Sequence, residues 1–505
     1  MDDLYFLGID IGTYESKGVI TNSAGEVIAR HTCPHELETP KPGYAEHYAE
    51  KTWWSDFCEI SAKLLEKSRI KATDIKAVGC STIAPCCLPV DKTCKPLRKA
   101  ILYGVDVRAV DEIAYLENLL GSENIQNKYG MPVTSQSAAA KILWLKNHEP
   151  EIYNSAAKFI TGTTYLVAKL TGNYVIDRYT AATWVPLYDV IKNDWDVETL
   201  NIFCKLEQLA QCNWTTDIAG KITFEAAAET GLAEGTPVIT GTADAAAEAV
   251  SAGVFESGDL MLMYGSSVFM IHVTERFKTD NRLCTGPYLF PGTFAVTAGM
   301  STAGTLTRWF RDQVAKDLLQ LQKQQGTNAY GMLAEEISSI PPGSDGLIVL
   351  PYFSGERTPI NDPQAKGIIF GLNLLHSRAH IFNACLEGIG YGIAQHFDIF
   401  KELQLETKKI MAVGGGTKNT KWLQIVSDIC GRTQHTVTEG IGASYGDTLL
   451  AATGIGYYKS IKQVGDLIKE NNIITPDEER HSQYSSPRLK YELLYRATKD
   501  IMHME

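Results

Sequence analysis

Hydrophobic and polar positions along the first part of the chain follow the periods of strands and helices in turn. Several apolar runs predict strands, and two of them flank Asn22-Ser-Ala-Gly25, a turn-forming segment that indicates a hairpin. Between residues 53 and 68 apolar side chains recur with helical spacing, which predicts a helix with one buried stripe. The predicted strands are 4–9, 19–21, 27–31, 77–80 and 86–90, and the helix stripe is Trp54, Phe57, Ile60, Ala62 and Leu64.

The same alternation continues through the rest of the chain. Helical patterns dominate residues 108–170, and an apolar strand within 235–244 leads into an alanine-rich helix that ends near residue 252. A hairpin pattern restarts at 254–258, so we predict two domains, 1–253 and 254–505. Because strands alternate with helices throughout, the predicted fold class is α/β. In the second half a hairpin of strands is predicted near 260–273, and further strands are predicted at 293–298, 346–350 and 409–413. The predicted helices are 303–324, 377–403, 419–430 and 443–453.

The first hairpin concentrates groups that suit phosphate. Its opening strand delivers Asp10 onto a turn at Gly12, and donors follow at Thr13, Ser16 and Lys17. Turn amides and hydroxyls bind phosphate oxygens, and a strand-end aspartate can hold Mg²⁺ beside them. We therefore predict a phosphate site at Asp10, Gly12, Thr13 and Lys17, with Asp10 as the metal ligand.

A second hairpin in the other half of the chain repeats this layout. Apolar residues on both sides of Gly265, Ser266 and Ser267 again give strand, glycine, hydroxyl and strand. Either hairpin alone could be an ordinary glycine turn. The pair, with one member in each half, indicates two related domains that clamp a nucleotide.

Asp244 is the candidate general base. It comes just beyond an apolar strand and before a helix, and strand-end carboxylates often carry chemistry in α/β proteins. The same position also suits a plain helix N-cap. From the residues alone, both interpretations remain open.

The segment Gly414-Gly-Gly-Thr-Lys-Asn419 follows a predicted strand and opens a predicted helix. Glycines let the backbone approach a flat or anionic ligand, and a helix N-terminus adds positive potential. The dinucleotide pattern G-x-G-x-x-G is not matched, and no G-x-x-x-x-G-K-[ST] loop occurs in the sequence. A glycine-rich turn without a ligand is the alternative.

The pentapeptide Gly442-Ala-Ser-Tyr-Gly446 matches the G-x-S-x-G pattern of serine hydrolases. In that case Ser444 would be the nucleophile. A histidine would then have to come from the remaining tail, where only His481 and His503 are available. We keep the hydrolase as an alternative function.

Composition and charge argue against a nucleic-acid-binding or membrane protein. The chain has 505 residues and a net charge of −12, which makes it a poor generic binder of nucleic acid or anionic membrane. The sequence starts Met-Asp-Asp without a basic segment, and no apolar run reaches the ~18–20 residues that span a bilayer. We expect a soluble cytoplasmic protein that has no signal peptide and binds neither nucleic acid nor membrane.

Cysteines and histidines give no metal pattern in the sequence. None of the 11 cysteines forms a C-x-x-C pair, which favours reduced structural thiols in a cytosol. The pairs His31/His35 and His376/His380 have no adjacent glutamate of the H-E-x-x-H type. We interpret these histidines as surface or capping residues.

Five segments in order resemble the FGGY carbohydrate kinase family, in its pentulose-kinase (xylulokinase-like) branch. The resemblance covers about residues 4–456. Ala138 and Cys385 depart slightly from the two family signatures in which they lie. The segments are Asp10–Thr13, Lys141–His148, Leu350–Pro359, Asn361–Pro363, and Gly367–Leu372 with His380 and Glu387.

This resemblance implies a fold, a reaction and roles for residues. The family fold is two actin-like (ribonuclease H-like) ATPase domains with a cleft between them, and the family phosphorylates a sugar hydroxyl with MgATP. The first domain then holds the sugar and the second holds ATP. Asp244 matches the catalytic base, and Asp10 lies by Mg²⁺ and the transferred phosphate. The implied nucleotide contacts are Gly265, Ser266, Ser267, Gly415, Gly416 and Asn419.

The sugar site departs from the xylulokinase pattern. Where those enzymes usually carry Gln-Met-His, this chain has Ile83-Ala84-Pro85. Thr82, Ala84, Asp106 and Arg108 are the predicted sugar contacts, together with Asp244. A ketopentose such as D-xylulose is the expected substrate, while another ketose, a polyol and gluconate remain open. An actin-fold ATPase without a sugar substrate is a further alternative, and a homodimer is an assembly that the family analogy allows.

Overall fold

The computed structural model describes residues 4–438 and 442–504, and these form two compact units. Unit 1 comprises Met1–Phe255, Glu275–Ala295 and Ile441–Ile468. Unit 2 comprises Glu256–Thr274, Val296–Gly440 and Lys469–Glu505. The functional division into 1–253 and 254–505 stays a prediction.

The central sheet of unit 1 is built around an antiparallel hairpin and a parallel neighbour. Its strand order is β13-β14-β5-β1-β2-β3, and β15 also pairs with β5. β1 runs antiparallel to β2 and parallel to β5, so β1 and β5 end at the same edge. The strands of this sheet are β1 (Tyr5–Ile11), β2 (Glu15–Asn22), β3 (Val27–Pro34), β5 (Ile75–Thr82), β13 (Ile218–Lys221), β14 (Pro237–Ile239) and β15 (Thr242–Ala243).

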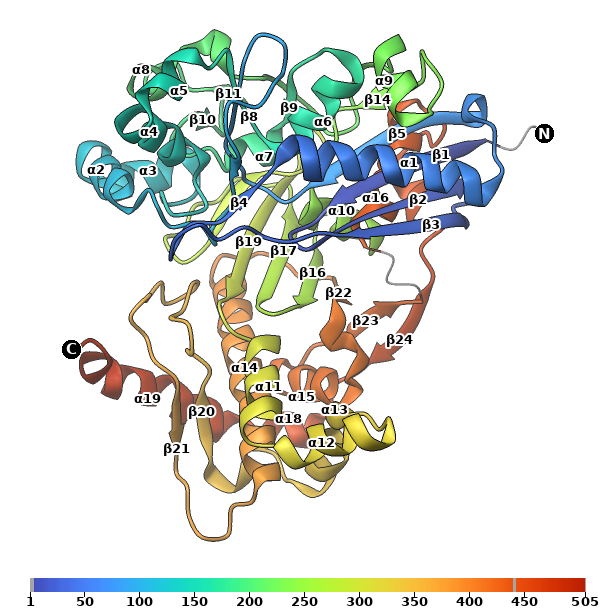
Figure 1. Cartoon of the computed structure of the whole chain (residues 1–505). Coiled ribbons are helices and arrows are strands. Elements are labelled where there is room, and N and C mark those ends of the chain that lie inside the picture. Colours follow the sequence, from blue (N-terminus) through green and yellow to red (C-terminus); the bar gives the residue numbers. More distant parts are fainter. Residues whose placement is uncertain (1–3, 439–441, 505) are drawn as a thin grey trace. The chain divides into compact units, whose positions relative to one another are not determined.

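Helices cover this sheet and bury its apolar residues. α1 packs on β2 and β3 (Figure 1), and Phe57, Ile60 and Leu64 of its predicted stripe are fully buried. Gly18 on β2 permits this close approach, because a Cβ there would lie 2.3 Å from the Ile60 side chain. The helices of unit 1 are α1 (Ser55–Ser68), α2 (Val110–Leu120), α3 (Ser122–Tyr129), α4 (Ala138–His148), α5 (Pro150–Ser155), α6 (Gly162–Thr171), α7 (Arg178–Ala182), α8 (Leu200–Phe203), α9 (Phe224–Thr230), α10 (Asp244–Ser251), α16 (Ala443–Gly454) and α17 (Ile461–Gly465).

Short strands complete unit 1 outside the central sheet. β8 interrupts the stretch 108–170 that the sequence predicts as helical, and it pairs with β6. The short strands are β4 (Glu46–His47), β6 (Leu88–Val90), β7 (Ala100–Ile101), β8 (Lys158–Ile160), β9 (Val175–Asp177), β10 (Tyr188–Asp189), β11 (Asp194–Trp195), β12 (Gln211–Asn213) and β18 (Cys284–Pro287).

Unit 2 repeats the hairpin with a parallel neighbour. Its sheet contains the order β19-β17-β16-β22-β23-β24, in which β16 is antiparallel to β17 and parallel to β22. Its strands are β16 (Asp259–Tyr264), β17 (Val268–Thr274), β19 (Phe294–Met300), β20 (Ile348–Leu350), β21 (Ile368–Phe370), β22 (Lys409–Val413), β23 (Gln434–Val437) and β24 (Glu470–Ile474). Its helices are α11 (Gly304–Gln313), α12 (Lys316–Gln325), α13 (Ala329–Glu336), α14 (Arg378–Glu402), α15 (Thr420–Cys430), α18 (Glu478–Gln483) and α19 (Ser485–Met502).

The predicted long elements of unit 2 agree with the structure except in one place. The helix predicted over 303–324 is two helices, α11 and α12, with a break at Val314 and Ala315. The apolar spacing continues across the break, which hides it in the sequence. Across the described residues, no helix combines the length and apolar character that a membrane span requires.

Candidate functional site

Strand register brings the polar strand ends of unit 1 together. Asp10 on β1 lies beside Ser81 on β5, and Ser81 lies beside Thr242 on β15. Asp244 comes two residues after Thr242 and begins α10. Residues from three distant parts of the sequence therefore meet at one edge of the sheet, the usual place for a site in an α/β fold.

Buried carboxylates gather at this edge. Ser81 Oγ donates a hydrogen bond of 2.7 Å to Asp447 Oδ2 and lies 3.4 Å from Asp10 Oδ1. Burial raises the pKa of Asp10 well above its usual range, and the nearby Asp244 charge raises it further. Burial likewise raises the pKa of Asp447, whose Oδ1 is buried without a hydrogen-bond partner in the described structure. Such a cluster favours a bound cation, which would offset the excess negative charge.

Asp244 and Glu248 add two carboxylates on one face of α10. Their spacing of four residues places both on the same side of the helix. Asp244 Oδ1 accepts a 2.7 Å hydrogen bond from the Ala245 backbone N–H. Burial raises the pKa of Asp244 to about 7, with a further contribution from Glu248. The carboxylate can therefore change protonation near neutral pH, which a plain N-cap does not need.

The turn of the first hairpin presents the other predicted phosphate groups. Gly12 N–H donates 3.0 Å to the Glu15 carbonyl, which closes the turn. Thr13 Oγ1 lies 2.9 Å from the hydroxyl oxygen of Tyr103. Lys17 faces Asp10 across the hairpin, and its ammonium lies 2.6 Å from Glu15 Oε1.

A buried histidine holds this turn in place. His35 Nε2 lies 3.1 Å from the Gly12 carbonyl oxygen, and His35 Nδ1 lies 2.9 Å from Asp56 Oδ2. Ser16 Oγ donates to the same Asp56 oxygen at 2.6 Å. The His35 side chain is only 8% exposed, so this histidine is not the surface residue that its sequence spacing indicates.

The predicted sugar contacts are largely engaged inside unit 1. Asp106 accepts the Ala45 N–H at 2.7 Å and forms a double hydrogen bond with Arg108. Arg108 also donates from Nη2 to Glu46 Oε1 at 2.8 Å. The Arg108 side chain is 1% exposed, and its guanidinium lies over the rings of Tyr44 and Trp144. The roles of Asp106 and Arg108 in sugar binding therefore stay predictions.

The end of β5 carries the remaining two predicted contacts. Thr82 is fully buried, and its hydroxyl lies 3.0 Å from Thr163 Oγ1. Ala84 is partly exposed beyond the strand. The roles of Thr82 and Ala84 in sugar binding stay predictions, and the buried Thr82 hydroxyl can act on a ligand only through its neighbours.

In unit 2 the second hairpin turn docks against the start of α11. Gly265 N–H donates 3.0 Å to the Ser267 carbonyl, and Gly304 N–H donates 3.0 Å to the Gly265 carbonyl. A Cβ at Gly304 would lie 2.5 Å from that carbonyl oxygen, so glycine is required there. Ser266 remains exposed on the turn.

A cavity of about 560 Å³ lies next to this turn within unit 2. Gly414 has φ of +87°, and a Cβ at Gly416 would lie 2.7 Å from the Tyr264 side chain, whereas one at Gly415 would meet nothing within 4 Å. Asn419 caps α15 by accepting the Trp422 N–H at 3.2 Å. The lining of the cavity includes Gly265, Ser266, Gly415, Gly416 and Asn419, together with Arg308, Asn328 and Tyr330.

The G-x-S-x-G segment has a packing role, and the hydrolase alternative is wrong. Ser444 lies inside α16, is 1% exposed, and its Oγ has no hydrogen-bond partner among the described residues. A Cβ at Gly446 would lie 1.9 Å from the Ala247 carbonyl, so this glycine allows α16 to touch α10. Gly442, the first residue of the G-x-S-x-G segment, is also the first residue of the described range 442–504.

Sequence reasoning missed several residues at these sites. Ser81 and Asp447 come from segments whose sequence pattern gives no sign of proximity to Asp10, and Tyr103 gives no sign of its contact with Thr13. Glu248 had a signal, because its spacing of four from Asp244 puts both on one helix face. His35 had none, because its partners Gly12 and Asp56 are set by the fold.

Known proteins match nearly the whole chain. Residues 5–251 match the model of the N-terminal domain of the FGGY family of carbohydrate kinases, and 260–455 match its C-terminal domain. The xylulose kinase of Escherichia coli K12 is 30% identical over 98% of this chain and 100% of its own length. A gluconokinase of Bacillus subtilis is 27% identical over 95% of this chain and 93% of its own. The structure of the xylulose kinase from Rhodospirillum rubrum superposes with a TM-score of 0.91 at 28% identity, covering 99% of this chain and 100% of that one.

Proposed function

The chain belongs to the FGGY family of carbohydrate kinases, and we propose that it phosphorylates a ketopentose such as D-xylulose with MgATP. Membership of this family makes the chain a sugar kinase that has an actin-like two-domain α/β fold and uses ATP as a substrate, and this confirms the prediction from the sequence. An actin-fold ATPase without a sugar substrate is thereby set aside. The observation that carries the proposal is the convergence of Asp10, Ser81 and Asp244 at one sheet edge.

Asp244 acts as the general base in this proposal. It accepts the proton of the sugar hydroxyl as that oxygen attacks the terminal phosphorus of ATP, and the bond to the ADP oxygen breaks. A positioned base of this kind contributes about 10²–10⁴-fold to the rate. The pKa of Asp244 near 7 suits a base that works at neutral pH.

Asp10 is the residue that would hold Mg²⁺, and the cluster around it fits a cation. Asp10 and Asp447 share Ser81, and the unpartnered Oδ1 of Asp447 leaves negative charge without a donor. Mg²⁺ is commonly bound through one or two carboxylates together with waters and phosphate oxygens. When bound, it neutralises charge on the phosphates. Thr13, Lys17 and the Gly12 turn would orient the transferred phosphate from the protein side.

The cavity of unit 2 would bind the nucleotide. Gly415 and Gly416 bring backbone close to a flat ligand, and the hairpin turn at Gly265 and Ser266 offers donors for phosphate. A volume of about 560 Å³ falls within the range of cofactor pockets.

The sugar site would combine charged and apolar groups. Asp244 and the Tyr103 hydroxyl would supply polar contacts, while Ile83, Ala84 and Pro85 replace the polar residues of typical xylulokinases. This replacement predicts fewer hydrogen bonds to the sugar. Because the chain also resembles a gluconokinase, gluconate is the second candidate substrate. We further propose a cytoplasmic location, since all 11 cysteines are free thiols.

The test is ADP release from MgATP with D-xylulose, other ketopentoses, ketohexoses, polyols and gluconate. We expect the highest kcat/KM with a ketopentose. A higher kcat/KM with gluconate or a polyol would overturn the ketopentose assignment. If no sugar raised ADP release above the rate without sugar, the kinase proposal itself would fail for this panel.

A further inference from the structure

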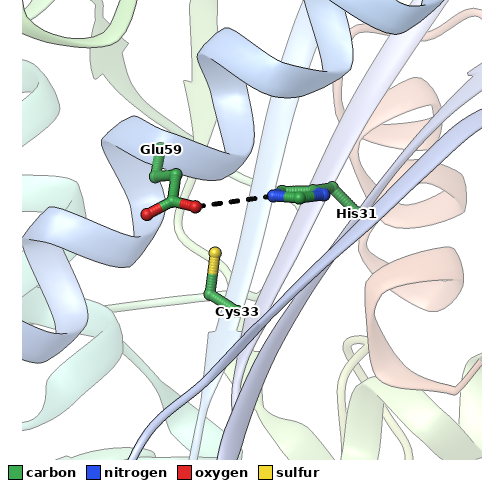
Figure 2. Close-up of side chains that lie close together, drawn as sticks. All are labelled: His31, Cys33 and Glu59. Atoms are coloured by element: carbon green, nitrogen blue, oxygen red, sulfur yellow. Dashed lines mark ion pairs between the residues drawn. The ribbon is translucent and has the colours of Figure 1, made fainter.

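Three potential metal ligands meet on the face of unit 1 between β3 and α1. His31 and Cys33 lie two residues apart on β3, so both side chains point to the same face of the strand. Glu59 reaches them from α1 (Figure 2). One nitrogen, one sulfur and one oxygen of these residues all lie within 4.8 Å of one another. Within the residues that the structure describes, no other group of three such ligands is this close.

The Cys33 thiol forms a hydrogen bond with Glu59, whereas the distance between His31 and Glu59 suits a shared metal better than a hydrogen bond. His31 Nε2 and Glu59 Oε1 are 3.6 Å apart, beyond hydrogen-bonding distance. Two ligands bound to one tetrahedral zinc ion at their normal bond lengths would lie about 3.4 Å apart. His31 Nε2 is buried and has no hydrogen-bond partner among the described residues. Figure 2 shows this nitrogen, the carboxylate and the Cys33 thiol directed into one small space.

We propose that His31, Cys33 and Glu59 form a binding site for a zinc-type divalent cation. A thiolate, an imidazole and a carboxylate are a ligand set that zinc accepts, whereas Mg²⁺ prefers oxygen ligands only. Glu59 is 57% exposed, so water can enter and complete the coordination. The cation would tie β3 to α1, and none of its three ligands is among the residues assigned to the kinase reaction. Cys33 pairs with Ser16 in the strand register, so the site adjoins the first hairpin.

Binding requires two proton movements. Cys33 loses its thiol proton to solvent, because the thiolate is the ligand. Burial and the nearby Glu59 charge raise the pKa of this thiol, so the cation must displace the proton. Lys67 Nζ now lies 2.9 Å from His31 Nδ1. When Nε2 binds the cation, Nδ1 carries the ring proton, and the exposed Lys67 moves away toward the Arg30 carbonyl, which is 3.2 Å from it.

Cobalt titration of the chelator-treated full chain tests this site, because a bound Cys33 thiolate gives a charge-transfer absorption band. We expect one equivalent of Co²⁺ with this band in the parent protein and no band in Cys33→Ser. His31→Gln and Glu59→Gln should weaken binding at least about tenfold. Cys58→Ser is the matched control, since Cys58 is a partly buried thiol of α1 outside the group, and it should keep the band.

Lys67 supplies a sharper test of the proposed geometry. Lys67→Gln removes a positive charge near the cation and should tighten Co²⁺ binding by about tenfold at low ionic strength. Weaker binding in this variant would contradict coordination through His31 Nε2. A parent protein without the charge-transfer band, or a band that persists in Cys33→Ser, would overturn the site. Added Zn²⁺ should also raise the unfolding midpoint of the parent but not of Cys33→Ser.

Discussion

The two phosphate-type hairpins share a backbone design but differ in the side chains that surround it. In both, a glycine N–H closes the turn with a 3.0 Å hydrogen bond, and the first strand also pairs with a parallel strand. Two residues before the glycine, β1 has Asp10 between Lys17 and Ser81. The same position of β16 has Met263 between Phe269 and Val413.

This difference separates two kinds of chemistry. The hairpin of unit 1 is surrounded by carboxylates. The raised pKa of Asp244 suits proton transfer, and the crowding of negative charge around Asp10 suits a bound cation. The hairpin of unit 2 has apolar neighbours and adjoins glycines and a cavity, which suits a ligand held by backbone and shape. The same glycine hairpin turn therefore suits two kinds of site, and the flanking side chains determine which kind each turn suits.

Removal of the proposed base from the site of unit 1 should have the largest effect on the reaction rate. Asp244→Asn keeps the shape of the side chain but cannot accept a proton, so kcat for the sugar should fall about 10²–10⁴-fold. Sugar-dependent ADP release measures kcat. The affinity for ATP should change little, because the proposed nucleotide contacts do not include Asp244. A variant with nearly full kcat would remove Asp244 from the role of base.

A methyl group in the glycine loop should damage nucleotide binding alone. In Gly416→Ala the new Cβ would lie 2.7 Å from Tyr264 and 2.8 Å from Trp422. Overpacking of this kind corresponds to about a tenfold or larger rise in KM for ATP, with the sugar KM unchanged. Gly415→Ala is the control, because its methyl group meets nothing within 4 Å, and its effect should be smaller. Equal effects of both substitutions would contradict this account of the cavity.

The pH dependence of kcat/KM should reveal the protonation of Asp244. Its pKa is raised to about 7, and only the ionised form can accept a proton. Activity should therefore be full above this pKa and fall as pH decreases through it, by about tenfold between pH 8 and pH 6. A pH–rate profile under saturating MgATP measures this. A flat profile across that interval would show that no such group limits the reaction.

Loosening the first turn should have the smallest effect. His35→Ala removes the contact with the Gly12 carbonyl, and kcat should fall about three- to tenfold, the cost of one hydrogen bond. Asp56→Asn should give a similar change, because Asp56 orients the ring. His435→Ala is the control, since His435 lies on β23 of unit 2, contacts Glu470 and does not touch the turn. A loss of activity in that control equal to the loss in His35→Ala would argue against a specific role for His35.

The sequence determined much of the fold and the identity of the main chemical groups. Local apolar period predicted β1, β16, α1, α14 and α15, because burial of one face imposes that spacing. It also marked Asp10, Asp244 and the glycine loop, since each follows an apolar strand directly. Motif resemblance then indicated the family that the comparisons show.

Only the tertiary structure decided which distant residues meet. Strand register placed Ser81 beside Asp10, and the packing of α16 brought Asp447 to the same serine. The same register and helix packing gave His35 its partners and joined Glu59 to Cys33. These contacts arise between segments far apart in the chain, where local hydrophobic pattern carries no information. The role of each residue therefore depends on spatial neighbours, and local sequence pattern does not show which residues become neighbours.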